Sequence, residues 1–198
     1  MSGYYIIKEN IQDKHPSIDV YNDCLRFDHK HKEAYCPLCN RFIEGSVWEG
    51  PYTFYVRSLQ LTDVLFPLAP VYILFSEKFV NMFYQEGLTG IKSMKACEIL
   101  FRGEKIPQKY FIPVFEYSNK ALDYALTKNN ERTSNKLLPR CSLCMKPNRE
   151  KDNLYFGDPT EIDIFKVYDR HGDLFCSESF VQFCHKLGIR AIEFRKIK

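Results

Sequence analysis

Two stretches of the chain carry the same order of apolar and polar positions. In the first, an apolar run ends at Ser76, a polar Glu77 follows, and apolar residues then recur at helical spacing. In the second, Ser177 and Glu178 stand in the same places. Serine is a favoured N-cap, and a carboxylate in the first turn interacts favourably with the helix dipole. The pattern predicts helices over residues 76–87 and 177–188, each ended by a glycine, with apolar faces formed by Phe79, Val80 and Phe83 and by Phe180, Val181, Cys184 and Leu187.

The two stretches align at an offset of 101 residues, with six identities in 16 positions. About one identity is expected by chance at average composition. One interpretation is that Ser-Glu-x-Phe-Val is simply a common way to begin a helix. The one we favour is a tandem duplication, which divides the chain into related halves at residues 1–100 and 101–198 that pack as one globular unit.

Short runs of β-branched and aromatic residues predict strands around these helices. The expected strands are residues 4–8, 47–61, 94–101, 109–117, 162–167 and 191–197, and a further short helix is expected over residues 119–128. Strands of mixed direction with few short helices give an α+β fold.

Four cysteines form two CxxC pairs whose first members are 105 residues apart. Structural zinc is commonly bound by four thiolates from two such turns. We therefore predict one structural Zn²⁺ that joins the two halves. Two disulfides, unrelated free cysteines and a redox-active CxxC are the alternatives, and His29 and His31 are expected to be exposed rather than ligands. The predicted metal ligands are Cys36, Cys39, Cys141 and Cys144.

Composition places the chain among globular proteins of a reducing compartment. Eight cysteines in 198 residues are too few for a disulfide scaffold, and residues 1–10 contain no long apolar leader. The longest apolar stretch, residues 64–75, is broken by Pro67 and Pro70, so no membrane segment is expected. We expect a cytoplasmic protein, where CxxC pairs usually bind metal.

Catalytic motifs are lacking, and we predict that the chain is not an enzyme. Cys184 and His185 are neighbours on a helix, about 100° apart, so Cys184 is expected in the core. His171 lies between Asp169 and Asp173 in a pattern typical of a turn. A zinc ion closed by four thiolates also leaves no position for an activated water.

With both CxxC pairs and the C-terminal half in view, the chain resembles the bacterial double-CxxCG-motif protein family. Residues 161–167, 177–181 and 192–195 are similar to that family's acidic-apolar strand, helix and closing strand. Residues 86–92 are similar to its central Glu-Gly-Leu segment.

The sequence departs from the family at Asn40 and Met145, which stand where the family carries glycine after each second cysteine. Asparagine tolerates a left-handed backbone, whereas methionine does not. The resemblance implies an immunity protein that binds a cognate bacterial toxin and blocks it by occlusion. It carries over no binding surface.

Two other functions remain open from the residues. Basic and aromatic side chains near the CxxC pairs are compatible with a zinc-dependent nucleic-acid-binding protein, although the formal charge of +3 is small for that class. These residues are Arg41, Arg140, Lys146, Arg149 and Lys151, with Tyr35 and Phe42 for stacking. A CxxC thiol-redox protein is the second alternative. An acidic edge at Asp158, Glu161 and Asp163 is either a mimic of nucleic acid or a solvated turn.

Overall fold

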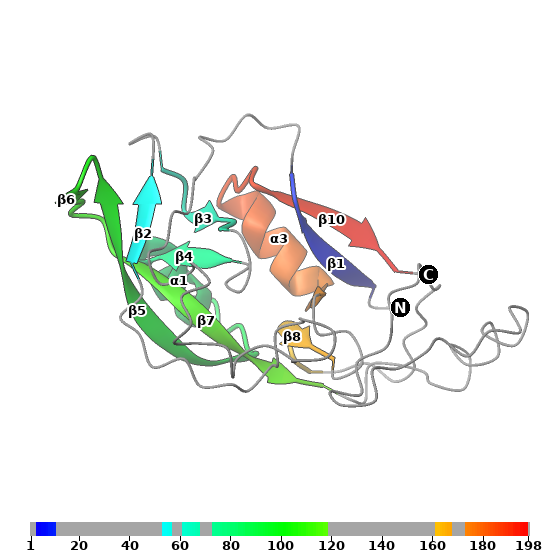
Figure 1. Ribbon diagram of the computed structural model, residues 1–198. Coiled ribbons are helices and arrows are strands. Elements are labelled where there is room, and N and C mark those ends of the chain that lie inside the picture. The colour runs from blue at the N-terminus through cyan, green and yellow to red at the C-terminus, as the bar shows by residue number, and fades with distance from the viewer. Residues whose placement is uncertain are drawn as a thin grey trace, which may run out of the picture.

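The computed structural model describes residues 3–10, 53–56, 61–67, 73–118, 161–167 and 173–197. This part of the chain has an α+β fold, as predicted, in which two helices pack against a mixed sheet (Figure 1). The elements are β1 (Tyr4–Glu9), β2 (Thr53–Val56), β3 (Val64–Leu65), β4 (Leu74–Ser76), α1 (Glu77–Gln85), β5 (Ile91–Phe101), β6 (Glu104–Lys105), β7 (Tyr110–Tyr117), β8 (Ile164–Lys166), β9 (Leu174–Ser177), α3 (Glu178–Lys186) and β10 (Ile192–Lys196).

Both predicted helices are confirmed, together with their capping residues. The Ser76 hydroxyl accepts a hydrogen bond from the Phe79 backbone N–H at 3.1 Å, and Ser177 does the same for Phe180 at 3.3 Å. Each hydroxyl pairs an N–H that the first helical turn leaves without an intrahelical partner. Gly87 and Gly188 have φ of 70° and 66°, and this left-handed backbone ends each helix.

The sheet runs in the order β10-β1-β9-β8-β7-β4-β3. Outside this order, β7 also pairs antiparallel with β5. The strand β5 in turn pairs with β2 in parallel and with β6 in a hairpin. The hairpin turn has positive φ at both central residues, Arg102 and Gly103, as expected of a type I′ turn.

The element order β-β-α-β occurs twice. We call β3, β4, α1 and β5 the N-terminal unit, and β8, β9, α3 and β10 the C-terminal unit. Each unit is completed by a strand from the other half of the chain, because β7 pairs with β4 and β5, and β1 pairs with β9 and β10. The strands on either side of the predicted division at residue 100 are therefore interleaved in one sheet.

The two units also agree in register. Tyr110 lies opposite the capping Ser76 in one unit, and Tyr4 lies opposite the capping Ser177 in the other. Where the completing strand ends, the Glu116 N–H donates to the Gly90 carbonyl at 2.8 Å. At the corresponding place the Asn10 N–H donates to the Ala191 carbonyl at 2.9 Å.

Apolar side chains are buried on both faces of the sheet. The helices cover one face, where Phe79 lies 5.3 Å from Phe183 and 6.4 Å from Phe180 between ring centroids. On the opposite face there are two smaller clusters in corresponding places. Their central members are Leu65, Leu74 and Tyr110 in one and Phe165, Phe175 and Tyr4 in the other.

Gly90 lies where the two units join. There β7 and β8 run parallel, and the Ile164 N–H donates to the Thr89 carbonyl at 3.2 Å. Gly90 has φ of 107°, and a Cβ on it would stand 1.8 Å from the Ile164 carbonyl oxygen. Only glycine permits both this backbone and this approach.

Most of the predicted strands are seen, with different bounds. The pattern over residues 47–61 corresponds to β2, the strand expected over residues 94–101 begins three residues earlier as β5, and that over residues 162–167 is shorter as β8. The two-residue strands β3 and β6 are not predicted by the pattern. The helix expected over residues 119–128 lies outside the described residues.

Candidate functional site

The predicted metal ligands Cys36, Cys39, Cys141 and Cys144 lie outside the described residues, as do the two histidines before the first pair. The basic and aromatic residues proposed for nucleic-acid binding lie outside them too. Within the described ranges, no group of three or more His, Cys, Asp or Glu side chains is placed to hold a metal ion. The zinc site stays a prediction.

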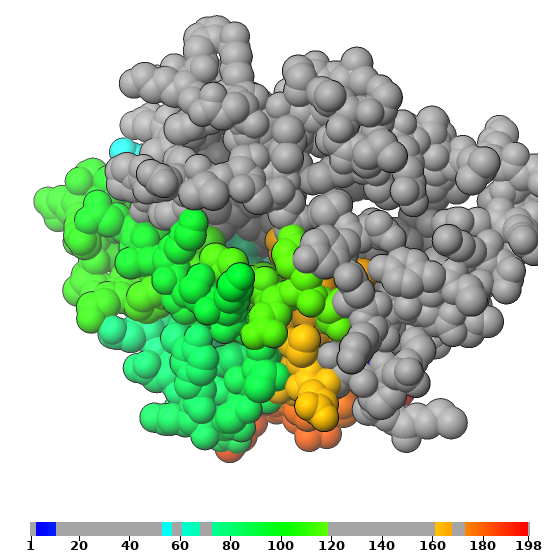
Figure 2. All heavy atoms as spheres, turned by 90° about the horizontal axis from the view of Figure 1, so that it is seen from below, coloured from blue at the N-terminus to red at the C-terminus, as the bar shows by residue number. Residues whose placement is uncertain are grey.

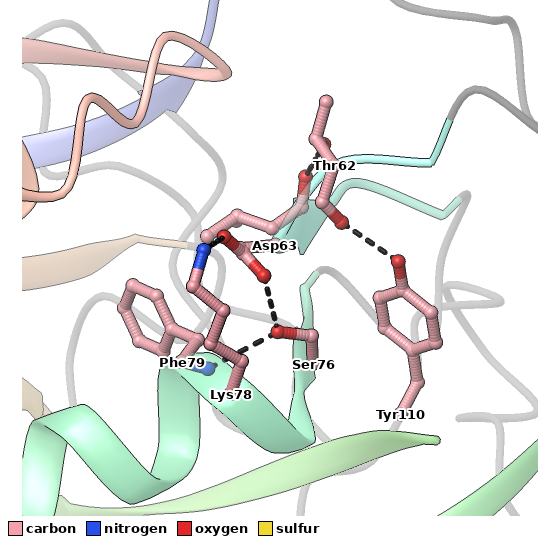
Figure 3. A network of polar contacts seen from close by, with 7 residues as sticks. Thr62, Asp63, Ser76, Lys78, Phe79 and Tyr110 are labelled. Atoms are coloured by element: carbon pink, nitrogen blue, oxygen red, sulfur yellow. Dashed lines mark hydrogen bonds and ion pairs between the residues drawn. The ribbon is translucent and has the colours of Figure 1, made fainter. Parts of the chain in front are cut away.

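The best-defined polar site in the described part is the start of α1 (Figure 3). The Ser76 hydroxyl donates to Asp63 Oδ1 at 2.7 Å, and the Ser76 backbone N–H donates to the Asp63 carbonyl at 2.9 Å. Lys78 Nζ donates to the other carboxylate oxygen of Asp63 at 3.0 Å. Beside them the Tyr110 hydroxyl donates to the Thr62 carbonyl at 2.8 Å. We call the Asp63–Ser76 pair the N-terminal clamp.

The start of α3 has the same arrangement, which we call the C-terminal clamp. The Ser177 hydroxyl donates to Asp163 Oδ1 at 2.7 Å, and the Ser177 backbone N–H donates to the Asp163 carbonyl at 2.8 Å. The second carboxylate oxygen of Asp163 accepts from the Thr89 N–H at 3.0 Å and from the Thr89 hydroxyl at 3.2 Å. This clamp therefore also connects the C-terminal unit to the loop between α1 and β5 of the N-terminal unit. In Figure 2 the surfaces of residues 77–90 and 161–166 adjoin.

Neither clamp is arranged for nucleophilic catalysis. Ser76 is 1% exposed, and its hydroxyl both donates to Asp63 and accepts from the Phe79 N–H. A serine nucleophile requires an adjacent base that takes its proton and access to a substrate. The clamp serines instead connect a strand, a helix start and an aspartate.

The acidic edge considered in the sequence is partly explained by these contacts. Asp163 accepts three hydrogen bonds from Ser177 and Thr89, so its carboxylate is engaged within the fold. Glu161 is exposed, and its carbonyl, 3.0 Å from the Thr89 hydroxyl oxygen, shares the single hydroxyl proton with Asp163. Asp158 lies outside the described residues. Among the described members of the edge, the arrangement favours a turn over a mimic of nucleic acid.

Of the three described thiols, those of Cys176 and Cys184 are buried in the core and that of Cys97 is partly buried. Cys184 is buried, as predicted, whereas the neighbouring His185 is exposed and its ring lies 5.9 Å from that of Phe194. Burial raises the pKa of Cys184 and of Cys176 above the ordinary value, and it raises that of Cys97 from 9.0 to about 12. A reactive cysteine needs the opposite shift, because the thiolate is the nucleophile.

The turn containing His171 is only partly described. Asp173 accepts from Lys8 Nζ at 2.7 Å, which connects β1 to the start of β9. His171 and Asp169 lie outside the described residues. In the described part of this turn, Asp173 therefore forms an ion pair that joins β1 to the residue before β9.

Few apolar side chains reach the surface in the described part of the chain. Tyr84 on α1 is the exposed large hydrophobic residue there, with 52% of its surface accessible. Near it, the ends of the two helices are connected by Lys186 Nζ, which lies 2.6 Å from Glu86 Oε1. Neither of the described helices, each nine residues long, is long and apolar enough to cross a membrane.

The clamp aspartates were not identified from the sequence. They precede their serines by 13 and 14 residues, which is too far for a local capping signal. The available signal is that Asp63 and Asp163 occupy corresponding places when the two capped helices are aligned and the alignment is extended backwards with a gap of one residue.

Comparison with models of known protein families gave no match to this chain, and comparison with curated protein sequences gave none either.

Proposed function

We propose that this chain is an immunity protein of the cytoplasm that binds a cognate bacterial toxin and neutralises it by covering its active site. The sequence resemblance to the double-CxxCG-motif proteins supports this function. The described polar groups are compatible with a binding role, because the clamp residues are hydrogen-bonded to one another, Cys176 and Cys184 are buried, and the Cys97 thiol donates to the Tyr110 carbonyl. Inhibition by occlusion requires a complementary surface rather than a reactive group.

The proposal includes an internal duplication. The observation that carries it is the correspondence of the two clamps: the same hydroxyl-to-carboxylate distance, the same backbone hydrogen bond and the same helix length occur in both units. The agreement in register of β1 and β7 supports it further. Each CxxC pair then lies at a corresponding place in the sequence of its half, after the completing strand (β1 or β7) and before the clamp aspartate.

The proposal also includes one structural zinc ion held by Cys36, Cys39, Cys141 and Cys144. Thiolate ligands must come from both halves, and each CxxC segment begins after a strand that completes the opposite unit. Such a zinc ion would stabilise the fold by its binding free energy and take no part in a reaction. Asn40 tolerates the left-handed backbone that glycine provides in the family, whereas Met145 does not, so the second CxxC turn requires another backbone conformation at that position.

The experiment is co-expression of the tagged chain with the product of the adjacent reading frame, followed by purification at moderate salt and a growth assay. A one-to-one complex that relieves growth inhibition supports the proposal. Retention of nucleic acid that falls steeply with salt would instead favour the zinc-dependent nucleic-acid binder, because phosphate contacts release counterions. Reversible oxidation of the CxxC pairs without bound metal would favour the thiol-redox protein.

A further inference from the structure

The strand β10 has one unpaired edge within the described part of the chain. It ends the strand order, pairs with β1 alone among the described strands, and lies at the outside of the sheet in Figure 1. The Ile197 N–H donates to the Tyr4 carbonyl at 2.8 Å, and the Ala191 carbonyl accepts from the Asn10 N–H at 2.9 Å. Backbone groups alternate in direction along a strand, so those of residues 191, 193, 195 and 197 point toward β1.

It follows that the N–H and C=O groups of Ile192, Phe194 and Lys196 point toward the open edge. Unpaired edge groups of this kind are a template for another strand. Three residues supply six backbone groups, which is enough for a short antiparallel pairing.

The side chains of β10 divide between two faces. Glu193 and Arg195 are exposed on one face, and Arg195 Nε lies 2.8 Å from Glu193 Oε1. On the other face Ile192 is buried, and Phe194 is half-buried against the ring of Phe180 at 6.4 Å. Lys196, which ends the strand on the same face as Phe194, is exposed as well. The strand therefore carries one negative and two positive side chains, and only Glu193 and Arg195 share the face away from Phe194.

We propose that β10 pairs antiparallel with β10 of a second copy of this chain, about a twofold axis at Phe194. In this register Glu193 of each copy lies directly opposite Arg195 of the other, and the outward backbone groups of Ile192 meet those of Lys196. Opposite charges at directly facing positions stabilise a strand pair, and like charges destabilise it.

The charges also select this register. A shift that keeps outward backbone groups facing one another moves the axis by one residue. It then places Glu193 against Glu193 of the second copy, or Arg195 against Arg195. Among these three registers, only the one centred on Phe194 places each Glu193 opposite an Arg195. It also brings the two half-buried Phe194 rings together across the axis, on the face that α3 covers.

The test uses single charge reversals studied alone and mixed. Wild-type protein is expected to dimerise with rising concentration in sedimentation or light-scattering measurements. Glu193→Arg gives two positive residues and Arg195→Glu gives two negative residues, so each variant alone should self-associate at least about tenfold more weakly. An equimolar mixture of the two should form a heterodimer, because every facing pair is again of opposite sign. The double variant E193R/R195E should dimerise like wild type.

Lys105→Glu, at the exposed ion pair with Glu98 on the β5-β6 hairpin, is the matched control and should leave dimerisation unchanged. Circular dichroism checks that each variant is folded. A wild-type chain that stays monomeric at high concentration overturns the proposal. So does a dimer that persists in both single variants, or a mixture that gives no heterodimer. None of these outcomes depends on the toxin, so the proposal stands or falls separately from the proposed function.

Discussion

Asp163 holds Ser177 by two hydrogen bonds, one from the serine hydroxyl to the carboxylate at 2.7 Å and one from the serine N–H to the aspartate carbonyl at 2.8 Å. The same serine accepts from the first turn of α3. The Asp163–Ser177 pair therefore connects β9, the start of α3 and the loop that contains Thr89. Loss of the Asp163–Ser177 contact should therefore weaken all three connections.

We predict that Ser177→Ala lowers the free energy of unfolding by about 1–2 kcal/mol, the usual cost of removing an N-cap. Urea denaturation monitored by circular dichroism measures it. Ser179→Ala is the control, because Ser179 lies on the exposed face of α3 two residues later and alanine favours a helix. Equal effects of the two substitutions would show that the cap contributes nothing beyond helix propensity.

Gly90→Ala is expected to destabilise the chain by more than about 3 kcal/mol or to prevent folding, since a backbone clash at the joint cannot be relieved by moving a side chain. Gly87→Ala should cost only about 1 kcal/mol, because Gly87 also has positive φ but a Cβ there meets nothing within 4 Å. Thermal denaturation of both variants measures the difference. If the two had equal effects, the close approach of Gly90 to Ile164 would carry no energetic weight.

Stability should fall in alkaline solution through Cys97. Burial raises the pKa of this thiol from 9.0 to about 12, so the folded state favours the protonated form. The resulting stabilisation is complete below pH 9 and is lost as the pH rises through 9 toward 12. Urea denaturation at a series of pH values should show this decline, and Cys97→Ala should reduce it. Part of the decline should remain, because burial also raises the pKa of Tyr110, Cys176 and Cys184. An unchanged profile in the variant would contradict the assignment.

Zinc analysis of freshly purified, reduced protein should give one ion per chain. Cys36→Ser and Cys141→Ser should each abolish zinc binding and lower the melting temperature, because a structural metal contributes its binding free energy to folding. Cys176→Ala is the control. It removes a buried thiol from the core and should leave the zinc content unchanged, although the chain becomes less stable. Two ions per chain, or none, would rule out the shared site.

The parts of the fold that the sequence predicts are those determined within a few residues. The capped helices are an example: Ser76 and Ser177 each accept a hydrogen bond from an N–H group only three residues later, so the cap can be predicted locally. The strands expected at residues 4–8, from clustered β-branched and aromatic residues, and at 191–197, from alternation, are confirmed because these signals are also local. Their pairing with each other is a different matter. Ile6 lies opposite Arg195, and no local pattern specifies a partner so distant in the chain.

The polar contacts show the same limit. The predicted caps are in place, but each aspartate that completes a clamp immediately precedes another strand and becomes a partner only after β3 pairs with β4, or β8 with β9. The CxxC pairs are the reverse case. The spacing alone predicts that they bind metal, whereas the four cysteines themselves lie outside the described residues.

The pairing of β1 determines when folding can finish during synthesis. Its two neighbours in the sheet are β9 (Leu174–Ser177) and β10 (Ile192–Lys196), which are translated long after β1 (Tyr4–Glu9). During synthesis, Tyr5 and Ile7 therefore lack these strand partners until residues 174–196 have been made. Such distant contacts fold slowly and expose apolar strands meanwhile. A translation product that stops before residue 174 would leave β1 with no sheet to join, and we expect it to require a chaperone or to be degraded.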